Sequence, residues 1–174
     1  MVRLRRAVGG DGPRLWALNE MPFVGNTADP SVPLQLPIPK QAPPAFPDLA
    51  NVEESFIGAG RDLIVAEVDG LIVGMCGFVP TSPSEVEILR LRLHPAVRRR
   101  GIARLMMADL EQRAAESGFA EIHLNTATNQ PEAQAFYDSL GYVEPSRETR
   151  PEWSWSLVYL RKRISQDRLL WNRS

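Results

Sequence analysis

The sequence predicts a single domain of the α/β class, built on a mixed, mainly antiparallel sheet of about six to seven strands with about four flanking helices. Segments in which apolar residues alternate with a period of two recur along the chain, and segments with helical spacing separate them. A chain of 174 residues, with 44% hydrophobic and 24% charged residues, suits one well-packed globule. The pair Asp69-Gly70 between two apolar runs is a strong hairpin signal, so neighbouring strands are expected to be antiparallel. We therefore treat residues 1–174 as one domain.

The N-terminal residues predict one strand and one helix. Val2 to Val8 alternates Val, Leu and Arg before Gly9-Gly10, which indicates a strand that ends in a turn. Asp11 is expected to cap the following helix with its side chain, and Pro13 suits the first helical turn. This helix is expected to end near Met21.

A proline-rich insertion occupies residues 22–47. It holds eight of the fifteen prolines and only two charged residues, Asp29 and Lys40, so regular helix or strand is not expected. Two interpretations stay open: a binding loop, or a surface-packed or disordered insertion. The segment does contain apolar residues that could be buried, at Leu34, Leu36, Ile38 and Phe46. A weak helix candidate follows, from Asp48 to Ala59.

The centre of the chain predicts three consecutive strands. Asp62 to Val68 and Leu71 to Val79 flank the hairpin signal, and a third strand runs from Glu85 to Leu93. Within the third strand the apolar residues change parity after Ile88. A phase change of one residue is what a β-bulge produces, so this central strand is predicted to be bulged.

A basic turn follows this strand and ends where a helix begins. After Gly101, apolar residues recur at helical spacing, at Ile102, Leu105, Met106 and Leu110. The first turn of a helix leaves backbone N–H groups without intrahelical partners and carries partial positive charge, so it binds anions. Glycine and Ala103 allow close approach to the backbone. Full charges come from Arg98, Arg99, Arg100 and Arg104. The turn predicts a pyrophosphate site.

The C-terminal third predicts strand, helix, strand and strand. A strand is expected over Ala120 to Thr128, and a short helix over Pro131 to Leu140 with Gly141 at its C-terminal cap. Tyr142 begins a further strand, and the last strand is expected over Trp153 to Ile164, with Trp153 and Trp155 packed on the sheet. Residues 165–174 form a short tail.

Composition excludes several classes of function. The net charge of −1 and pI near 6.2 argue against a nucleic-acid binder. No apolar run approaches membrane-spanning length, and the lone Cys76 sits in an apolar run, so we expect a cytoplasmic protein without a membrane partner. His94 and His123 lack partners at metal-ligand spacing, so no metal is implied. No Ser-His-Asp or Cys-His pattern indicates a protein nucleophile.

Two motifs together resemble a known family. The basic turn is not a Walker A loop, because no Gly-Lys-Ser/Thr follows, and it lacks the three-glycine spacing of dinucleotide sites. The first motif is Glu87-Ile88-x-Arg90-Leu91-x-Leu93-x-Pro95 followed by Arg98-x-x-Gly101-x-Ala103; the second is Ala133-x-x-Phe136-Tyr137-x-x-x-Gly141-Tyr142. They resemble the acetyl-coenzyme A binding core of the GNAT superfamily of N-acetyltransferases. The resemblance is close over residues 87–143, weaker over residues 2–20 and 62–81, and absent over residues 21–60.

The resemblance implies a GNAT-like domain with acetyl-CoA as the acyl donor. It places the pantetheine arm in the gap that the bulge opens and the pyrophosphate on the basic turn. The implied cofactor-binding residues are Leu91, Leu93, Arg98, Arg99, Arg100, Gly101, Ile102, Ala103 and Arg104. The family's cofactor-binding asparagine falls on Gln130 by spacing, whereas an asparagine stands at Asn129, and the choice between the two stays open.

The resemblance also implies two catalytic residues. A protonated amine with a pKa of roughly 10.4 must lose a proton before it attacks a thioester. Glu87 stands where some family members carry the general base, although other members use water relays. Tyr137 matches the tyrosine that protonates the departing thiolate. The expected reaction is direct attack in a ternary complex by a small-molecule or peptide amine, and the alternative is a non-catalytic acyl-CoA binding regulatory module. The acceptor cannot be read from the sequence, and the protein is expected to be a monomer or homodimer.

Overall fold

The computed structural model describes residues 1–21 and 28–164. The predicted tail at 165–174 and residues 22–27 of the insertion lie outside the described residues. One sheet has the strand order β1-β2-β3-β4-β5-β7-β6. The strands are β1 (Val2–Arg6), β2 (Asp62–Val68), β3 (Leu71–Pro80), β4 (Glu85–Leu93), β5 (Glu121–Ala127), β6 (Val143–Thr149) and β7 (Ser156–Arg163). Among these strands of the described residues, only β4 and β5 pair in parallel, which confirms the predicted mixed, mainly antiparallel sheet.

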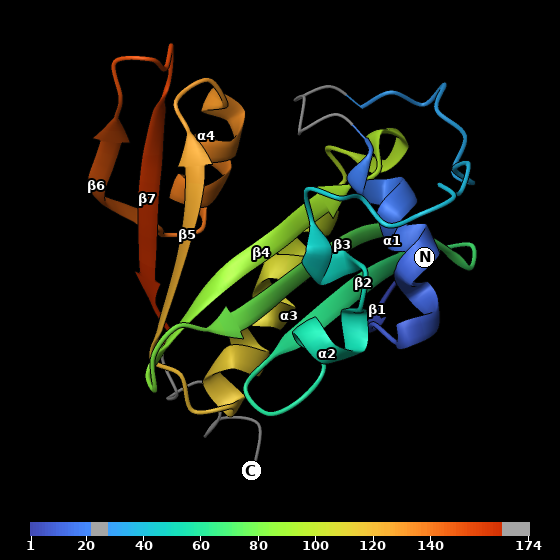
Figure 1. Ribbon diagram of the computed structural model, residues 1–174, viewed down its shortest axis with the longest axis horizontal. Coiled ribbons are helices and arrows are strands. Elements are labelled where there is room, and N and C mark those ends of the chain that lie inside the picture. Colours follow the sequence, from blue (N-terminus) through green and yellow to red (C-terminus); the bar gives the residue numbers. More distant parts are fainter. Residues whose placement is uncertain (22–27, 165–174) are drawn as a thin grey trace.

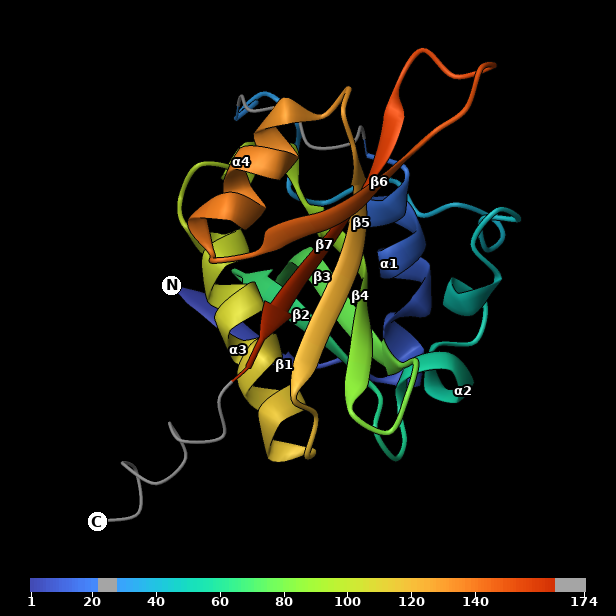
Figure 2. The same cartoon turned by 90° about the vertical axis from the view of Figure 1, so that its left-hand side faces the viewer.

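Helices cover both faces of the sheet (Figures 1 and 2). They are α1 (Gly12–Asn19), α2 (Val52–Phe56), α3 (Ile102–Glu116) and α4 (Pro131–Ser139). One core cluster joins buried residues of α3 and α4 to one face of the sheet, and a second joins α1 and α2 to the other face. Burial of apolar side chains on both faces is the main stabilising contribution. The predicted count of four helices is confirmed.

The predicted bulge lies in β4. Met75 of β3 pairs with Arg92, whereas Gly77 pairs with Leu89, so β4 has one residue more than β3 over this stretch. The extra residue bends the strand, and Arg90 has a φ of 58° there. Beyond residues 85–87, β4 no longer pairs with β5, and the two strands diverge (Figure 1).

Two local expectations are wrong. Asp11 does not cap α1 with its side chain, since its backbone is already helical; its carboxylate accepts from the Val8 amide at 2.9 Å and from the Arg5 guanidinium at 2.8 Å. Trp153 and Trp155 do not lie in a strand. Thr149 pairs with Ser156, so the six residues between them form the loop of the β6–β7 hairpin and have no partner strand. The two indoles stack on each other, with ring centroids 4.4 Å apart.

The described part of the insertion, residues 28–47, packs on the domain without α-helix or strand, as its prolines predict. The weak helix candidate after it shortens to a 3-10 turn (Pro47–Leu49) and α2. The Asp29 amide donates to the Pro95 carbonyl oxygen at 2.9 Å. His94 Nδ1 accepts from the Ala96 amide at 3.0 Å, so Nε2 carries the proton and donates to the Pro33 carbonyl oxygen at 2.9 Å. Burial lowers the pKa of His94, which favours this neutral form.

Candidate active site

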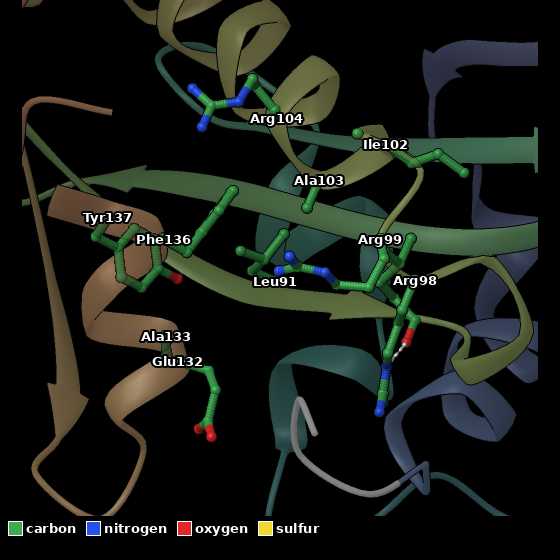
Figure 3. A pocket seen from close by; sticks show the side chains of 12 residues that line it. Leu91, Arg98, Arg99, Ile102, Ala103, Arg104, Glu132, Ala133, Phe136 and Tyr137 are labelled. Atoms are coloured by element: carbon green, nitrogen blue, oxygen red, sulfur yellow. Dashed lines mark hydrogen bonds between the residues drawn. The ribbon is translucent and has the colours of Figure 1, made fainter. Parts of the chain in front are cut away.

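A first cavity of about 270 Å³ lies between the start of α3 and the face of α4 (Figure 3). Its walls are Leu91, Leu93, Arg98, Arg99, Gly101, Ile102, Ala103, Arg104, Glu132, Ala133, Phe136 and Tyr137. Eight of the eleven residues predicted to bind the cofactor are in this set. The other three are Arg100, Asn129 and Gln130. Arg100 is exposed on the same turn, Asn129 is exposed, and Gln130 lines a second cavity, described below.

Gly101 makes the end of the basic turn suitable for an anion. It is the N-cap of α3 and has a left-handed conformation, with φ 78° and ψ 6°. A Cβ built on it would meet no protein atom within 4 Å, so the glycine faces open space at the helix start. Glycine is favoured here by its backbone angles and leaves the amides of the first turn of α3 accessible to a phosphate oxygen.

Arginines lie in the turn and in the first part of α3. Arg98 is only 8% exposed, and its Nε donates to the Leu93 carbonyl oxygen at 3.3 Å, the contact drawn in Figure 3. Burial lowers the pKa of Arg98 from its ordinary value, which still leaves it charged at neutral pH. Arg104 donates to the Ser139 hydroxyl at 2.8 Å and so links α3 to α4. Positive charge and free helical amides together are the chemistry that binds a pyrophosphate.

A second cavity of about 210 Å³ opens beside the bulge. It is lined by Phe46, Glu87, Ile88, Leu89, Arg90, Leu91, Arg92, Leu124, Asn125, Thr126, Gln130, Ala133 and Tyr137. Three residues, Leu91, Ala133 and Tyr137, line both cavities. The two cavities therefore meet at α4, in the gap where β4 and β5 diverge.

The two predicted catalytic residues both line the second cavity. Glu87 is half-buried and is the last residue of β4 that pairs with β5, opposite His123. Tyr137 is 8% exposed, and its ring packs against Tyr142 with centroids 5.7 Å apart. Burial raises the pKa of the Tyr137 hydroxyl, while the charge of Arg92 opposes this change. The hydroxyl is protonated at neutral pH and can donate a hydrogen bond.

Sequence reasoning missed Arg92 and Glu132. Arg92 lies in the second cavity, is 6% exposed, and donates to the Leu91 carbonyl oxygen at 3.0 Å. Burial, with a further effect from the charge of Arg90, lowers the pKa of Arg92 to about 10, so the guanidinium stays charged at neutral pH. The sequence signal that could have identified Arg92 was its place in the alternation of residues along β4 after the bulge. Glu132 follows the first residue of α4 and had no distinguishing pattern.

The insertion reaches the second cavity through Phe46, and Asp48, just after the insertion, pairs with Arg90 in the cavity wall. The Arg90 guanidinium donates to both carboxylate oxygens of Asp48, at 2.8 and 3.2 Å, and lies 4.4 Å from the centroid of the Phe46 ring. Phe46 itself forms one wall of the cavity. A segment that the sequence separates from the central motif by about forty residues is thus attached to the bulge.

In residues 1–21 and 28–164, no cluster of three or more His, Cys, Asp or Glu side chains is arranged to hold a metal ion. Within the same described ranges, no helix has the length and apolar character needed to cross a membrane.

Residues 33–142, more than half of the chain, match the model of the acetyltransferase (GNAT) family. The chain belongs to the GNAT family. Among curated GNAT-type relatives, human N-acetyltransferase 8 is 31% identical over 113 residues, which cover 62% of this chain and 50% of the relative. The uncharacterized N-acetyltransferase YjgM of Escherichia coli is 32% identical over 56% of this chain and 60% of its own length. The chain spans about half the length of the mammalian relatives that it matches.

Solved GNAT structures share the fold at low sequence identity. An acetyltransferase of the GNAT family from Staphylococcus aureus superposes with a TM-score of 0.73 at 17% identity, over 95% of this chain and all of the other. A GNAT superfamily phosphinothricin acetyltransferase from Sinorhizobium meliloti, solved in complex with acetyl-CoA, gives a TM-score of 0.72 at 17% identity, over 95% of this chain and 89% of the other. These likenesses confirm the predicted GNAT-like fold.

Proposed function

We propose that this GNAT protein transfers the acetyl group of acetyl-CoA to an amine by direct attack within a ternary complex. The observation that carries the proposal is the meeting of two cavities at Tyr137. One cavity has the helix start and arginines that suit a pyrophosphate, and the other has a carboxylate beside an open space. Curated relatives that are N-acetyltransferases, and fold neighbours solved with acetyl-CoA, support the same donor and reaction class.

On the donor side, the pyrophosphate binds the backbone amides at Gly101 to Ala103 and the charges of Arg98 and Arg99. The pantetheine arm then runs along Leu91 and Leu93 towards α4. In this orientation the thioester carbon lies near Tyr137, in the gap between β4 and β5. Asn129 and Gln130 remain alternative contacts for the arm.

On the acceptor side, Glu87 removes a proton from the ammonium group, directly or through a water molecule. The neutral amine attacks the thioester carbon, and a tetrahedral intermediate forms. When the intermediate collapses, the carbon–sulfur bond breaks and the sulfur takes a proton from the Tyr137 hydroxyl. The attacking nitrogen, which carries a positive charge in the intermediate, loses its second proton, and a proton from solvent restores the Tyr137 hydroxyl. The products are the N-acetylated amine and free coenzyme A thiol.

The proposal is tested by release of free coenzyme A thiol from acetyl-CoA with a panel of amines. We expect amine-dependent release well above the rate of hydrolysis, and a loss of about a hundredfold in Glu87→Gln if Glu87 is the base. Glu144→Gln, which removes an exposed carboxylate on β6, is the control and should behave as wild type. Binding of acetyl-CoA without amine-dependent release would favour a non-catalytic acyl-CoA binding module instead.

A further inference from the structure

The second cavity has an unusual distribution of charge. Its charged side chains are one carboxylate, Glu87, and two guanidinium groups, Arg90 and Arg92. Arg90 is neutralised by its two-pronged ion pair with Asp48. Arg92 is almost fully buried and supplies a second positive charge to the wall of the cavity.

Glu87 and Arg92 lie on the same face of the sheet, five positions apart along β4, and both line this cavity. Glu87 pairs with Val79 and Arg92 with Met75, and both partners pack in the core on the α1 and α2 side. Five positions along a strand separate their Cα atoms by roughly 16 Å at most, and the bulge shortens this span. The two side chains thus bracket a space that suits a small molecule with one charge at each end.

We propose, resting on the acetyl transfer proposed above, that the acceptor is a small amino acid-like amine whose carboxylate binds Arg92 while its amino group faces Glu87. A guanidinium forms paired hydrogen bonds with a carboxylate, and these are strong where water is excluded. The acceptor therefore enters with its two charged groups matched to Glu87 and Arg92.

The position of Arg92 assigns it to the acceptor and not to the donor. It lines the second cavity and is absent from the first, whose arginines are those of the basic turn and Arg104. The same charges disfavour two other acceptor classes. A polyamine would place a second cation next to Arg92, and the N-terminal amine of a peptide carries no nearby carboxylate.

The volume of the cavity agrees with this class. About 210 Å³ is below the roughly 300–1,000 Å³ of sites for drug-sized ligands, so the acceptor is small. Phe46 and Leu124 add apolar wall, so a side chain of modest size and low polarity fits between the two charges.

The test compares amines that differ only in the carboxylate. Thiol release from acetyl-CoA is measured with the twenty standard amino acids, with the carboxamide of each, and with spermidine. For the best amino acids we expect kcat/KM to exceed that of the carboxamide by about ten- to a hundredfold, mainly through KM, as expected for hydrogen bonds between charged groups.

Variants locate the effect at Arg92. In Arg92→Gln the acid should fall to the level of its carboxamide, and Arg92→Lys should keep part of the preference. Arg147→Gln, which removes an exposed positive charge on β6, is the matched control. Acetyl-CoA affinity, measured by calorimetry, should be unchanged in all three. The acid–carboxamide comparison needs only the wild-type protein, so it holds even if a variant fails to fold.

Three results would overturn the inference. Carboxamides or spermidine that are acetylated as well as the amino acids would show that no carboxylate is recognised. An equal loss for acid and carboxamide in Arg92→Gln would show that Arg92 serves the fold or the reaction instead. In both cases acetyl transfer itself would stand, whereas no thiol release with any amine would overturn the proposed function as well.

Discussion

Packing holds the Tyr137 ring in place, so the hydroxyl is available to donate a hydrogen bond. Its ring lies against Phe136 and Tyr142, with centroids 5.3 and 5.7 Å away, so its position depends little on the hydroxyl. Burial raises the hydroxyl pKa, which keeps the proton on the oxygen at neutral pH. The hydroxyl can therefore donate a hydrogen bond to the sulfur as negative charge develops there. The residue combines a fixed position with an available proton.

Tyr137→Phe should therefore impair turnover and spare the fold. General acid catalysis contributes about a hundredfold to ten-thousandfold, and a moderately acidic leaving thiol places the expected loss near the lower limit. Single-turnover rates with saturating acetyl-CoA measure this loss. Tyr142→Phe is the control: its hydroxyl donates to Glu111 at 3.0 Å, outside both cavities, so it should lower stability without changing the rate. Wild-type rates for Tyr137→Phe at every pH would mean that the ring is only packed.

Gly101→Val should abolish acetyl-CoA binding in a protein that still folds. A valine there both resists the left-handed backbone and fills the space in front of the helix amides. Gly118→Val separates the two effects, because Gly118 also has a positive φ, 93°, with open space around it, but lies at the other end of α3. Both variants should lose roughly 1–2 kcal/mol of stability. Only Gly101→Val should lose calorimetric affinity, and equal affinities in the two variants would refute the role of the turn.

At the scale of single elements, β4 shows which features of the fold and the site could be predicted from the sequence. Its bulge and the basic turn were predictable because the parity change and the helix start lie within one continuous stretch. Phe46 lines the same cavity and Asp48 pairs with Arg90 from about forty residues away, and no local pattern predicts these contacts. The loop position of Trp153 was missed for a similar reason: the alternation of the last predicted strand begins before Ser156, where β7 and its pairing with β6 begin.

Asp48, just after the insertion, forms an ion pair with Arg90 at the bulge, which makes the role of the insertion testable. Asp48→Asn weakens the pairing with Arg90 and loosens the Phe46 wall of the second cavity. A half-buried pair contributes about 1 kcal/mol, so the Michaelis constant of the acceptor should rise roughly fivefold. Affinity for acetyl-CoA should not change, because the first cavity keeps all of its walls.

Asp69→Asn is the matched control for this change, since Asp69 lies exposed in the β2–β3 turn and asparagine accepts its positive φ. It should leave both constants unaltered. An acceptor Michaelis constant in Asp48→Asn that equals that of the control would remove the insertion from the acceptor site.

At the scale of the whole molecule, the two parts of the sheet are connected by a short pairing between β4 and β5. Three residue pairs connect β4 to β5, whereas seven connect β5 to β7. The unit β5, α4, β7 and β6 is thus joined to the rest of the sheet at one end and separated from it at the other, where the cavities lie (Figure 1). Arg104, through its hydrogen bond to Ser139, links α3 to α4 across the gap.

Acetyl-CoA bound in this gap should join the two parts of the sheet, because its walls belong to α3 and β4 on one side and to α4 on the other. We expect amide hydrogen exchange to slow on α4 and on the first turn of α3 when acetyl-CoA is added. Amides of α1, a helix that packs on the far face of the sheet, should change little. Gly101→Val should show no slowing, which ties the effect to binding. Equal slowing on α1 and α4 would mean that the molecule opens only as one unit, and that the gap between β4 and β5 does not divide it.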